Sequence, residues 1–385
     1  MADTLVSSGK LFHGRLGLQQ RVLPAYRARF FDCLGSACTD GLSVFAGEPG
    51  PNESITATRQ LIKADIIQSH NRHFFQVDSP FYVLWQEGLI EWLEGWEPHA
   101  LVVEANPRYL STRRAISWMR ARGRPVIGWG LGAPPFHPTT VTARMIATML
   151  ERIRRNFLYS CDALIAYSRR GADQFRALGI PGERIFVATN AVASRPSDPA
   201  PNRPDSITHR PVVLFVGRLQ ARKRIDNLLR ACDGLPESLQ PRLIIVGDGP
   251  ARTDYQNLAQ SIYPQAEFVG QKRGRELQEY FLRADLFVLP GTGGLAVQEA
   301  MAYGLPAIVA QGNGTQEDLI KIGNGWLVPP DDLPALQQAM EEALSDPVKL
   351  RRMGAESYRI VSEEVNVENM VSVFVHVLNK LIDIV

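Results

Sequence analysis

Four cationic side chains follow the end of a predicted strand in the second half of the chain. The run GRLQARKR (217–224) comes directly after an apolar segment and directly before a helical pattern that starts at Ile225. Charge-assisted hydrogen bonds from Arg218 and Lys223 would each contribute about 1.5–3 kcal/mol to holding an anion. Taken alone, the run has a second interpretation, a basic turn surrounded by water.

A glycine-rich turn lies further along, where the segment LPGTGGL (289–295) leads into a helical pattern at 296–303. The first amide N–H groups of a helix have no partner within the helix and carry a partial positive charge, which suits them to anions. Glycines also let a phosphate approach the main chain closely. Together with the cations at 217–224, this turn predicts a diphosphate site that requires no metal ion.

Other catalytic motifs are absent or incomplete. The segment GDGPAR (247–252) approaches the dinucleotide-binding pattern G-x-G-x-x-G, but Arg252 stands at the third glycine and the segment does not follow the first strand of either half. The sequence contains no GxxxxGK[ST] loop, no GxSxG elbow and no cluster with metal-ligand spacing. Its seven histidines form no local group, so none is predicted as a base. A net charge of +2 is too balanced to indicate a nucleic-acid partner.

Short apolar segments alternate with helical patterns in the second half and would position both loops. Strands are predicted at 211–217, 242–247, 266–270, 285–290, 307–310 and 325–328. Apolar strands separated by helical patterns indicate a parallel sheet that is covered on both faces. Ligands of such sheets bind beyond the carboxyl ends of the strands, which is where both loops are expected.

The first half has the pattern of a similar domain, with strands predicted at 41–46, 100–103, 125–128, 163–166 and 184–189. A chain of 385 residues that is 45% hydrophobic and 21% charged is long and apolar enough for two folded domains. We predict an N-terminal, acceptor-side domain at 1–195, a proline-rich linker at 196–210, a C-terminal, donor-binding domain at 211–365, and a final helix at 366–385 that crosses back to the first domain.

Several segments of the second half follow one another in a characteristic order. They are FVGRL (215–219) with Lys223, IVGDGP (245–250), VG (269–270), ADLFVLP (284–290), EAMAYGLP (299–306) and GWLV (325–328). In order and spacing they resemble the retaining glycosyltransferases of family 4, the glycosyl transferases group 1. The resemblance covers 212–340 and extends more loosely to 161–168 and 190–192. It implies an α/β chain with the GT-B fold, two Rossmann-like, doubly wound parallel-sheet domains that face a cleft.

The resemblance also implies roles around a nucleoside-diphosphate sugar, which would be bound as the donor substrate and not as a permanent cofactor. Arg218 and Lys223 would hold the diphosphate and stabilise its charge as the glycosidic bond breaks. Glu299 would bind the ribose hydroxyls. The other nucleotide-binding residues implied are Gly17, Gly217, Gly249, Gly270, Gln271, Lys272, Thr292, Gly293, Gly294 and Leu295. Of these, Gly270, Gln271 and Lys272 fall where the base is usually recognised, and Gly17 is expected in a turn before the first helix.

The chain departs from the family pattern in two places. The family usually has a pair of glutamates with seven residues between them, and counting back from Glu299 the first of the pair is Gly291 here. The family also often has a histidine near the sugar, whereas 103–107 and 128–132 contain none. We predict that Glu104, Asn106 and Trp129 line the acceptor side. For Glu104 a buried, hydrogen-bonded carboxylate is the alternative.

The leading hypothesis is a glycosyltransferase that moves a hexose to a hydroxyl of a glycan, a glycolipid or a lipid carrier, without a metal and with retention of configuration. The alternative is a non-catalytic GT-B protein, a sugar-nucleotide-binding module or a partner subunit, for which Gly291 is the main support. A sugar-nucleotide epimerase is disfavoured because the matching loops lack the acids and the histidine that it needs.

A basic amphipathic pattern at 143–158 leaves the location open. Its arginines and apolar residues fit either an anionic membrane surface or an ordinary packed helix with a solvated arginine face. The chain begins without the pattern of a signal peptide and contains no apolar run of membrane-spanning length. We therefore expect a cytoplasmic protein, either free or peripheral on the inner face of the membrane.

Overall fold

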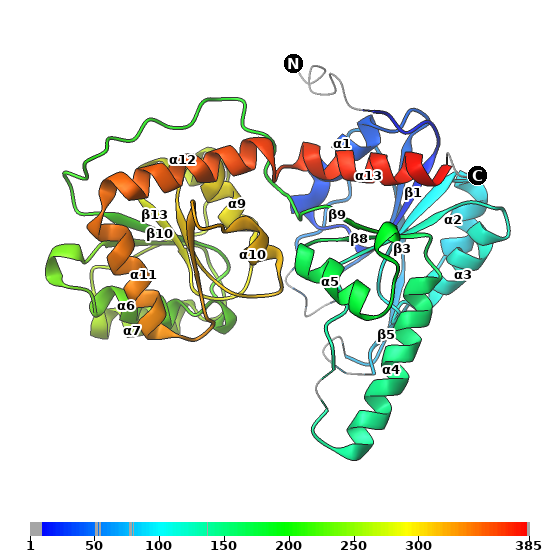
Figure 1. Ribbon diagram of the computed structural model, residues 1–385, viewed down its shortest axis with the longest axis horizontal. Helices are drawn as coiled ribbons and strands as arrows, with labels where there is room; N and C mark the ends of the chain where they lie inside the picture. Colours follow the sequence, from blue (N-terminus) through cyan, green and yellow to red (C-terminus); the bar gives the residue numbers. More distant parts are fainter. Residues whose placement is uncertain are drawn as a thin grey trace. The chain divides into compact units, whose positions relative to one another are not determined.

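Parallel strands alternate with helices throughout the computed structural model, which describes residues 10–50, 53, 55–76, 79, 81–136 and 138–382. The described residues form two compact units by their contacts (Figure 1). Unit 1 lies within Met1–Asn190 and Val367–Val385, and unit 2 spans Ala191–Asn366. The first residues of the predicted first domain, 1–9, lie outside the described residues. So do the last residues of the predicted final helix, 383–385.

The sheet of unit 2 runs in the order β12-β11-β10-β13-β14-β15, and all of its neighbours pair in parallel. Its strands are β10 (Val212–Val216), β11 (Arg242–Val246), β12 (Glu267–Gly270), β13 (Leu286–Leu289), β14 (Ala307–Ala310) and β15 (Gly325–Val328). Its helices are α6 (Ile225–Asp233), α7 (Arg252–Ile262), α8 (Gly274–Arg283), α9 (Leu295–Ala302), α10 (Thr315–Leu319), α11 (Leu333–Ser345) and α12 (Pro347–Glu363). The strands predicted for the second half are confirmed.

The order of unit 2 reverses between β10 and β13, which is the point where doubly wound sheets bind their ligands. The chain passes outward from β10 through β11 to β12 and then returns to the other side of β10 with β13. The helices that follow β10 and β13, α6 and α9, therefore cover opposite faces of the sheet, while the loops before them start side by side at its carboxyl edge. The predicted basic run and the predicted glycine turn are these two loops.

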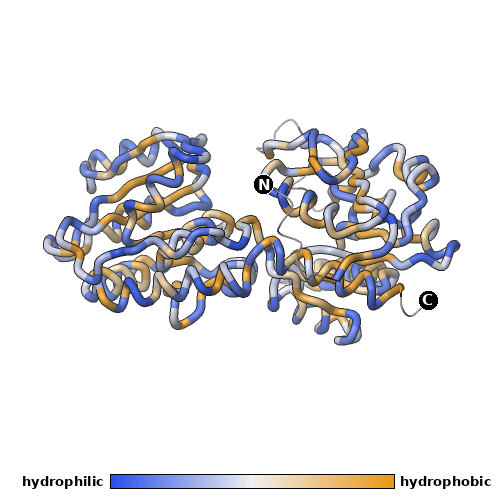
Figure 2. The backbone as a smooth tube through the Cα atoms, turned by 90° about the horizontal axis from the view of Figure 1, so that it is seen from above, coloured by the Kyte–Doolittle hydropathy of each residue, from blue (hydrophilic) through white to orange (hydrophobic). Residues whose placement is uncertain are grey.

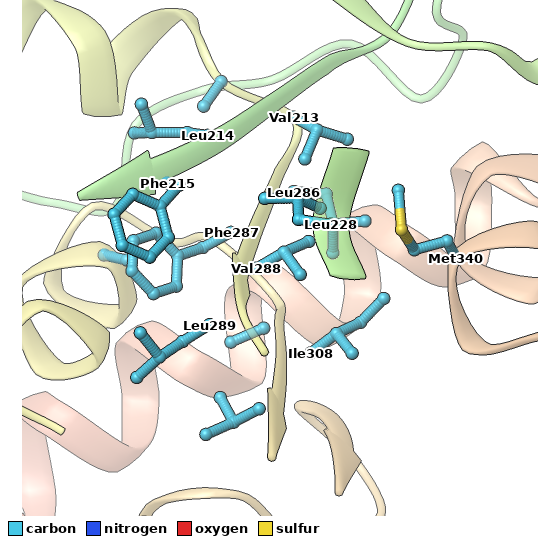
Figure 3. Packing of buried hydrophobic residues seen from close by; sticks show 14 of the residues in the cluster. Val213, Leu214, Phe215, Leu228, Leu286, Phe287, Val288, Leu289, Ile308 and Met340 are labelled. Carbon is cyan, nitrogen blue, oxygen red and sulfur yellow. The ribbon is translucent and has the colours of Figure 1, made fainter. Parts of the chain in front are cut away.

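Apolar strands covered on both faces stabilise unit 2. Val213, Leu214 and Phe215 of β10 are fully buried although successive side chains point to opposite faces. Figure 3 shows them with Phe287 of β13, Leu228 of α6 and other buried side chains of the same cluster. In Figure 2 hydrophobic stretches of the backbone, in orange, run through both units. A continuous core of this kind fixes the positions of the carboxyl ends of β10 and β13 relative to each other.

A buried ion pair joins α12 to the same sheet. Arg351 and Asp285 lie 2.6 Å apart with only 8% and 3% of their side chains exposed. The second carboxylate oxygen of Asp285 accepts a hydrogen bond of 2.8 Å from the backbone N–H of Val212, at the start of β10. The segment predicted as a linker, 196–210, contains no helix or strand, and its Arg203 donates to carbonyls at the end of α8, including that of Phe281 at 2.9 Å.

Unit 1 has a parallel sheet in the order β3-β2-β1-β6-β7-β8-β9, which reverses between β1 and β6. Its strands are β1 (Leu16–Val22), β2 (Leu42–Gly47), β3 (Asp65–Ser69), β6 (Ala100–Glu104), β7 (Val126–Gly130), β8 (Ala163–Ala166) and β9 (Ile185–Val187). A separate antiparallel pair consists of β4 (Asn71–Phe74) and β5 (Val83–Gln86). The helices are α1 (Ala28–Ser36), α2 (Leu89–Trp96), α3 (Leu110–Arg120), α4 (Val141–Tyr159), α5 (Arg169–Ala177) and α13 (Val367–Ile382). Among the described residues, none of the helices combines the length and the apolar character that a bilayer crossing needs.

The final helix completes the core of unit 1. Phe374 of α13 is fully buried, and its ring lies 5.1 Å from the rings of both Phe30 in α1 and Trp129 in β7. Further along α13, the side chain of Asn379 donates to the backbone carbonyl of Leu11 at 3.0 Å. The last helix of the chain therefore packs with the first.

The prediction for the start of unit 1 was wrong, because the first strand of the sheet is β1 and not 41–46. Gly17 lies inside β1, near its amino end, and not in a turn before a helix. A Cβ at this position would meet Trp92 at 3.1 Å, so the glycine allows close packing. Two glutamines disguise the strand: Gln19 and Gln20 are both buried, and Gln19 donates to Gln86 at 2.7 Å and accepts from Thr112 at 3.0 Å.

Candidate functional site

The basic run and the glycine turn of unit 2 contact each other directly. The backbone N–H of Thr292 donates to the carbonyl of Arg222 at 3.1 Å, and the Arg222 guanidinium donates to the Thr292 hydroxyl at 3.1 Å. The ammonium of Lys223 donates to the carbonyl of Thr292 at 2.5 Å. The two loops that were predicted to act together from separate parts of the sequence thus form one structure at the strand-order reversal.

Lys223 occupies a desolvated position in this structure. Burial, together with the nearby positive charge of Arg222, lowers the pKa of its ammonium from the ordinary 10.5 to about 8. The glycine at position 293 leaves room for this ammonium, because a Cβ there would overlap it. The φ of Gly293, +125°, also favours glycine. The negative charge of a bound anion would favour the protonated ammonium and so oppose both causes of the lowered pKa.

The remaining cations of the run divide into an exposed one and a paired one. Arg218 is exposed, and among the described residues its side chain has no hydrogen bond or ion pair. Arg224 has a left-handed backbone (φ +53°) and pairs with Asp226 at 3.1 Å and with Asp331. Arg218 is therefore available to a ligand, whereas Arg224 shapes the turn.

Glycines at the ends of β10 and β11 bring the two loop bases together. A Cβ at Gly247 would lie 2.9 Å from the carbonyl carbon of Gly217, and one at Gly249 would lie 2.8 Å from the backbone nitrogen of Leu219. The N–H of Leu219 donates to the carbonyl of Asp248 at 2.9 Å. The GDG segment thus has a packing reason for its glycines, and Gly249 in particular faces backbone.

Gly291 is equally constrained. It is buried, and a Cβ there would lie 2.6 Å from the carbonyl carbon of Lys223. Its own carbonyl accepts a hydrogen bond of 3.2 Å from the buried side chain of Gln316, which also donates to Ala310 at 3.0 Å. A glutamate at this position would require the basic run to move, so the departure from the family pattern is built into the packing of the two loops.

Helix α9 begins at Leu295, directly after Gly294, so its first amides follow the Lys223–Thr292 contact along the chain. Glu299 lies on the same helix and is partly buried, which raises the pKa of its carboxyl group. Its carboxylate has no hydrogen-bond or ion-pair partner in the part of the chain that the structure describes. An acceptor without a partner on the helix that starts at the glycine turn can bind ligand hydroxyls.

The three residues predicted at the base lie at the end of β12, two strands away from β10. Gly270 has a positive φ of +76°, and its carbonyl accepts from the N–H of Gly247 at 2.9 Å. Lys272 lies 3.6 Å from Glu276 in a partly exposed ion pair. These three residues are therefore on the same carboxyl edge as the basic run but two strands away from it. An extended ligand could place its base at one of these positions and its diphosphate at the other.

In unit 1 the predicted acceptor-side residues lie at the ends of β6 and β7. Glu104 accepts from the N–H of Arg21 at 2.5 Å, and burial raises the pKa of its carboxyl group. Asn106 accepts from the N–H of Arg108 at 3.1 Å and so stabilises its own loop. The alternative stated for Glu104, a buried and hydrogen-bonded carboxylate, agrees with this geometry. Trp129 is 1% exposed, and its ring is part of the core.

A polar group that sequence reasoning missed surrounds the end of β1. Arg21 pairs with Glu53 at 2.6 Å, and His73 of β4 shares a hydrogen bond of 3.0 Å with Tyr82. Burial and the charge of Arg21 lower the pKa of His73. No spacing rule could connect these residues, because the β4–β5 pair that carries His73 was not predicted.

One hollow of unit 1 contains none of the predicted site residues. A hollow of about 270 Å³ in unit 1 lies at the amino ends of its strands, lined by residues that include Arg124, Val126 and Asp162. In the described part of the chain, no three His, Cys, Asp or Glu side chains gather closely enough to hold a metal ion.

Known proteins resemble this chain most clearly over unit 2. The family described as glycosyl transferases group 1 matches residues 198–360. The chain is 27% identical over 234 residues to the alpha-D-kanosaminyltransferase of Streptomyces kanamyceticus, and these cover 56% of this chain and 60% of that protein. It is 40% identical over 123 residues to a GDP-mannose-dependent alpha-mannosyltransferase of Mycobacterium tuberculosis, which cover 31% and 30% of the two chains. The matches thus span less than two thirds of these curated relatives.

Solved structures resemble the whole chain. The sucrose-phosphate synthase of Thermosynechococcus elongatus has a TM-score of 0.70 at 20% identity, with 96% of this chain and 100% of that chain covered. HepE of Anabaena, solved in complex with UDP, has a TM-score of 0.70 at 17% identity, with 95% and 99% covered. These similarities establish the fold, and the predicted GT-B fold with two Rossmann-like, doubly wound domains is confirmed.

Proposed function

We propose that the protein is a glycosyltransferase that moves a hexose from a nucleoside-diphosphate sugar to a hydroxyl of a glycan, a glycolipid or a lipid carrier, without a metal ion and with retention. One observation carries the proposal. At the strand-order reversal of unit 2, the Lys223 ammonium and the glycine turn before α9 are in contact, on the loop that also carries Arg218, whose side chain has no partner among the described residues. Two cations and helix-start amides at a ligand-binding edge suit a diphosphate.

The chemistry would be stabilisation of the leaving group. As the bond from the sugar to the diphosphate breaks, negative charge grows on the phosphate oxygens. Lys223 and Arg218 then gain more from the departing diphosphate than from the intact donor, which lowers the barrier. The backbone amides of Gly294 and Leu295 would add donors on the same side. These groups can supply the positive charge that a metal ion supplies in other enzymes, which supports metal independence.

The rest of the donor would extend along the carboxyl edge. The carboxylate of Glu299, which has no partner among the described residues, would accept from the ribose hydroxyls, and the end of β12 at Gly270 would receive the base. HepE was solved with UDP, and one relative is named GDP-mannose-dependent, so uridine and guanosine are the first bases to test. Retention of configuration rests on the family resemblance alone.

The test is a calorimetric titration with UDP, GDP, ADP and TDP. We expect one of them to bind, and Arg218→Ala and Lys223→Ala each to weaken it about tenfold or more. The matched control is Arg230→Ala, because this exposed arginine lies in the last turn of α6, away from the loop that precedes the helix. Equal affinity in all four proteins contradicts the diphosphate assignment.

An anionic membrane surface is the proposed second partner, and α4 supports it. The helix projects from unit 1 in Figure 1, and it leaves Met145 71% and Met149 56% exposed. Other exposed apolar and basic residues of the same helix are Val141, Arg144, Ile146, Arg152, Ile153 and Arg155. A helix with exposed methionines and arginines fits the boundary between lipid headgroups and acyl chains. This placement corresponds to a peripheral protein on the inner face of the membrane.

A second candidate function follows from Gly291. A protein without the first glutamate of the family pair could bind a sugar nucleotide as a module or partner subunit and transfer nothing. Incubation of the bound donor with a panel of hydroxyl acceptors distinguishes the two functions. Release of the nucleoside diphosphate that depends on Lys223 supports the transferase, and tight binding without release supports the binding module.

A further inference from the structure

A buried arginine at the carboxyl edge of the unit 1 sheet has aromatic neighbours where a carboxylate would be expected. Arg27 is 6% exposed, and its guanidinium lies 4.8 Å from the ring of Trp129 and 4.9 Å from the ring of Tyr167. Tyr26 lies at 5.7 Å, and one terminal nitrogen, Nη2, donates to the side-chain oxygen of Asn190 at 3.1 Å. These residues come from the loop after β1, from β7, and from the chain after β8 and β9.

Two donors in this cage have no acceptor. The other terminal nitrogen of Arg27, Nη1, and the indole nitrogen of Trp129 are both buried without a hydrogen-bond partner among the described residues. Glu104 is close enough to interact electrostatically with Arg27, but its carboxylate is engaged by the N–H of Arg21 and the hydroxyl of Tyr109. Buried donors are almost always paired in folded proteins, so two in one cage call for an acceptor from outside the chain.

The stacking alone does not account for this arrangement. Cation–π contact holds the guanidinium in place, yet it leaves both N–H groups unpaired. A neutral side chain could pack between the rings and would leave no buried, unpaired donor on the guanidinium. A charged fork beside an unpaired indole N–H instead matches the oxygen atoms of an oxyanion, because guanidinium and indole are both pure donors.

We propose that Arg27 and the indole N–H of Trp129 form an oxyanion site for a phosphate or a carboxylate group. Both donors are buried, so the group enters when Tyr26, which is 51% exposed, turns away from the guanidinium. The site lies at the edge where doubly wound sheets bind ligands. Assigning the group to an anionic acceptor substrate rests on the proposed function, whereas binding of the oxyanion itself does not.

The indole N–H of Trp129 gives a readout that belongs to this site. Its signal in a ¹H–¹⁵N spectrum is assigned by its loss in Trp129→Phe, which keeps an aromatic ring in the core. Inorganic phosphate, acetate and uncharged glucose are then titrated separately. We expect phosphate or acetate to shift the signal downfield in a saturable way and glucose to leave it in place. Saturation by phosphate alone identifies a phosphate group, and saturation by acetate alone identifies a carboxylate.

Two variants complete the test. Arg27→Met should abolish the shift, and Arg27→Lys, which keeps the charge without the fork, should weaken binding about tenfold. Trp129→Phe, followed by calorimetry, should weaken the same anion. Arg218→Ala should keep the indole shift while it loses the nucleoside diphosphate, so that this site and the proposed donor site fail independently. An indole signal that no anion moves, or a shift that persists in Arg27→Met, overturns the proposal.

Discussion

The ammonium of Lys223 donates a hydrogen bond of 2.5 Å to the carbonyl oxygen of Thr292 and thereby joins the basic run to the glycine turn of unit 2. An ammonium group has three donors, and this contact uses one of them. The others are available to a ligand at the start of α9. The same contact keeps the ammonium in a partly buried position, where its pKa is lowered to about 8.

The affinity for a nucleoside diphosphate should fall as the pH rises through about 8, the pKa of Lys223 in the free protein. Only the protonated amine donates charge-assisted hydrogen bonds, so affinity should decrease by up to about tenfold for each pH unit above that value. The control is Lys223→Arg, whose charge persists through this range and whose profile should stay flat. Calorimetry between about pH 7.5 and 9.5 measures both. A wild-type profile as flat as that of the variant contradicts the prediction.

Restoring the family glutamate through Gly291→Glu should damage the site. A Cβ at this position would lie 2.6 Å from the carbonyl carbon of Lys223, so the basic run must shift. We expect a loss of about 1–3 kcal/mol in the free energy of unfolding, as in other overpacked sites, and at least about tenfold weaker nucleotide binding. Gly323→Ala is the control, because its Cβ would meet its nearest neighbour, Glu356, at an ordinary 3.5 Å. A Gly291→Glu protein with normal stability and increased transfer would contradict the prediction, because the two loops would then accommodate the glutamate without loss.

Breaking the buried ion pair of unit 2 should be costly. In Asp285→Asn the guanidinium of Arg351, which is 8% exposed, loses its charged partner. We expect a loss of about 3–5 kcal/mol in the free energy of unfolding, measured in urea. The exposed pair of Arg283 and Glu279, 3.9 Å apart, provides the control, and Glu279→Gln should change stability by less than about 1 kcal/mol. Equal effects of the two substitutions would falsify the assigned role of the buried pair.

The exposed face of α4 predicts a specific defect in membrane binding. Met149→Glu places a carboxylate on the apolar face and should weaken binding to anionic phosphatidylglycerol vesicles about tenfold or more. Val348→Glu introduces the same charge at an exposed valine of unit 2 and should leave binding unchanged. Co-sedimentation with vesicles measures both variants. If the two bind equally, or if the wild type ignores the vesicles, α4 has no membrane role.

Local patterns were sufficient for unit 2 because most of its strands are apolar on both faces, and β10, β11 and β12 end at or directly before a glycine. The segments around Phe215 and Phe287 needed only hydrophobicity and spacing to be predicted as strands, and the loops after them carry the charges and glycines of the candidate site. The contact between Lys223 and Thr292 joins residues 69 positions apart. It follows from the order of the strands in the sheet.

Unit 1 was harder to predict because its edge is stabilised by polar contacts between distant residues. The sequence predicts an exposed residue at Gln19, but hydrogen bonds with the distant Gln86 and Thr112 allow it to be buried. His73, whose pKa is affected by the pair of Arg21 and Glu53, belongs to the β4–β5 pair, whose strands have no clear alternation in the sequence. The cage around Arg27 likewise assembles residues from four separate loops and strands, so no spacing could have indicated it.

The packing of Phe374 against Phe30 and Trp129 also sets the order in which the chain matures. During translation the residues of unit 2 emerge as one uninterrupted stretch and can fold as soon as they leave the ribosome. Unit 1 is made first but must wait, its aromatic layer open, until α13 has been synthesised. The half of the chain that is synthesised first can therefore complete its core only after the half that follows it has been made.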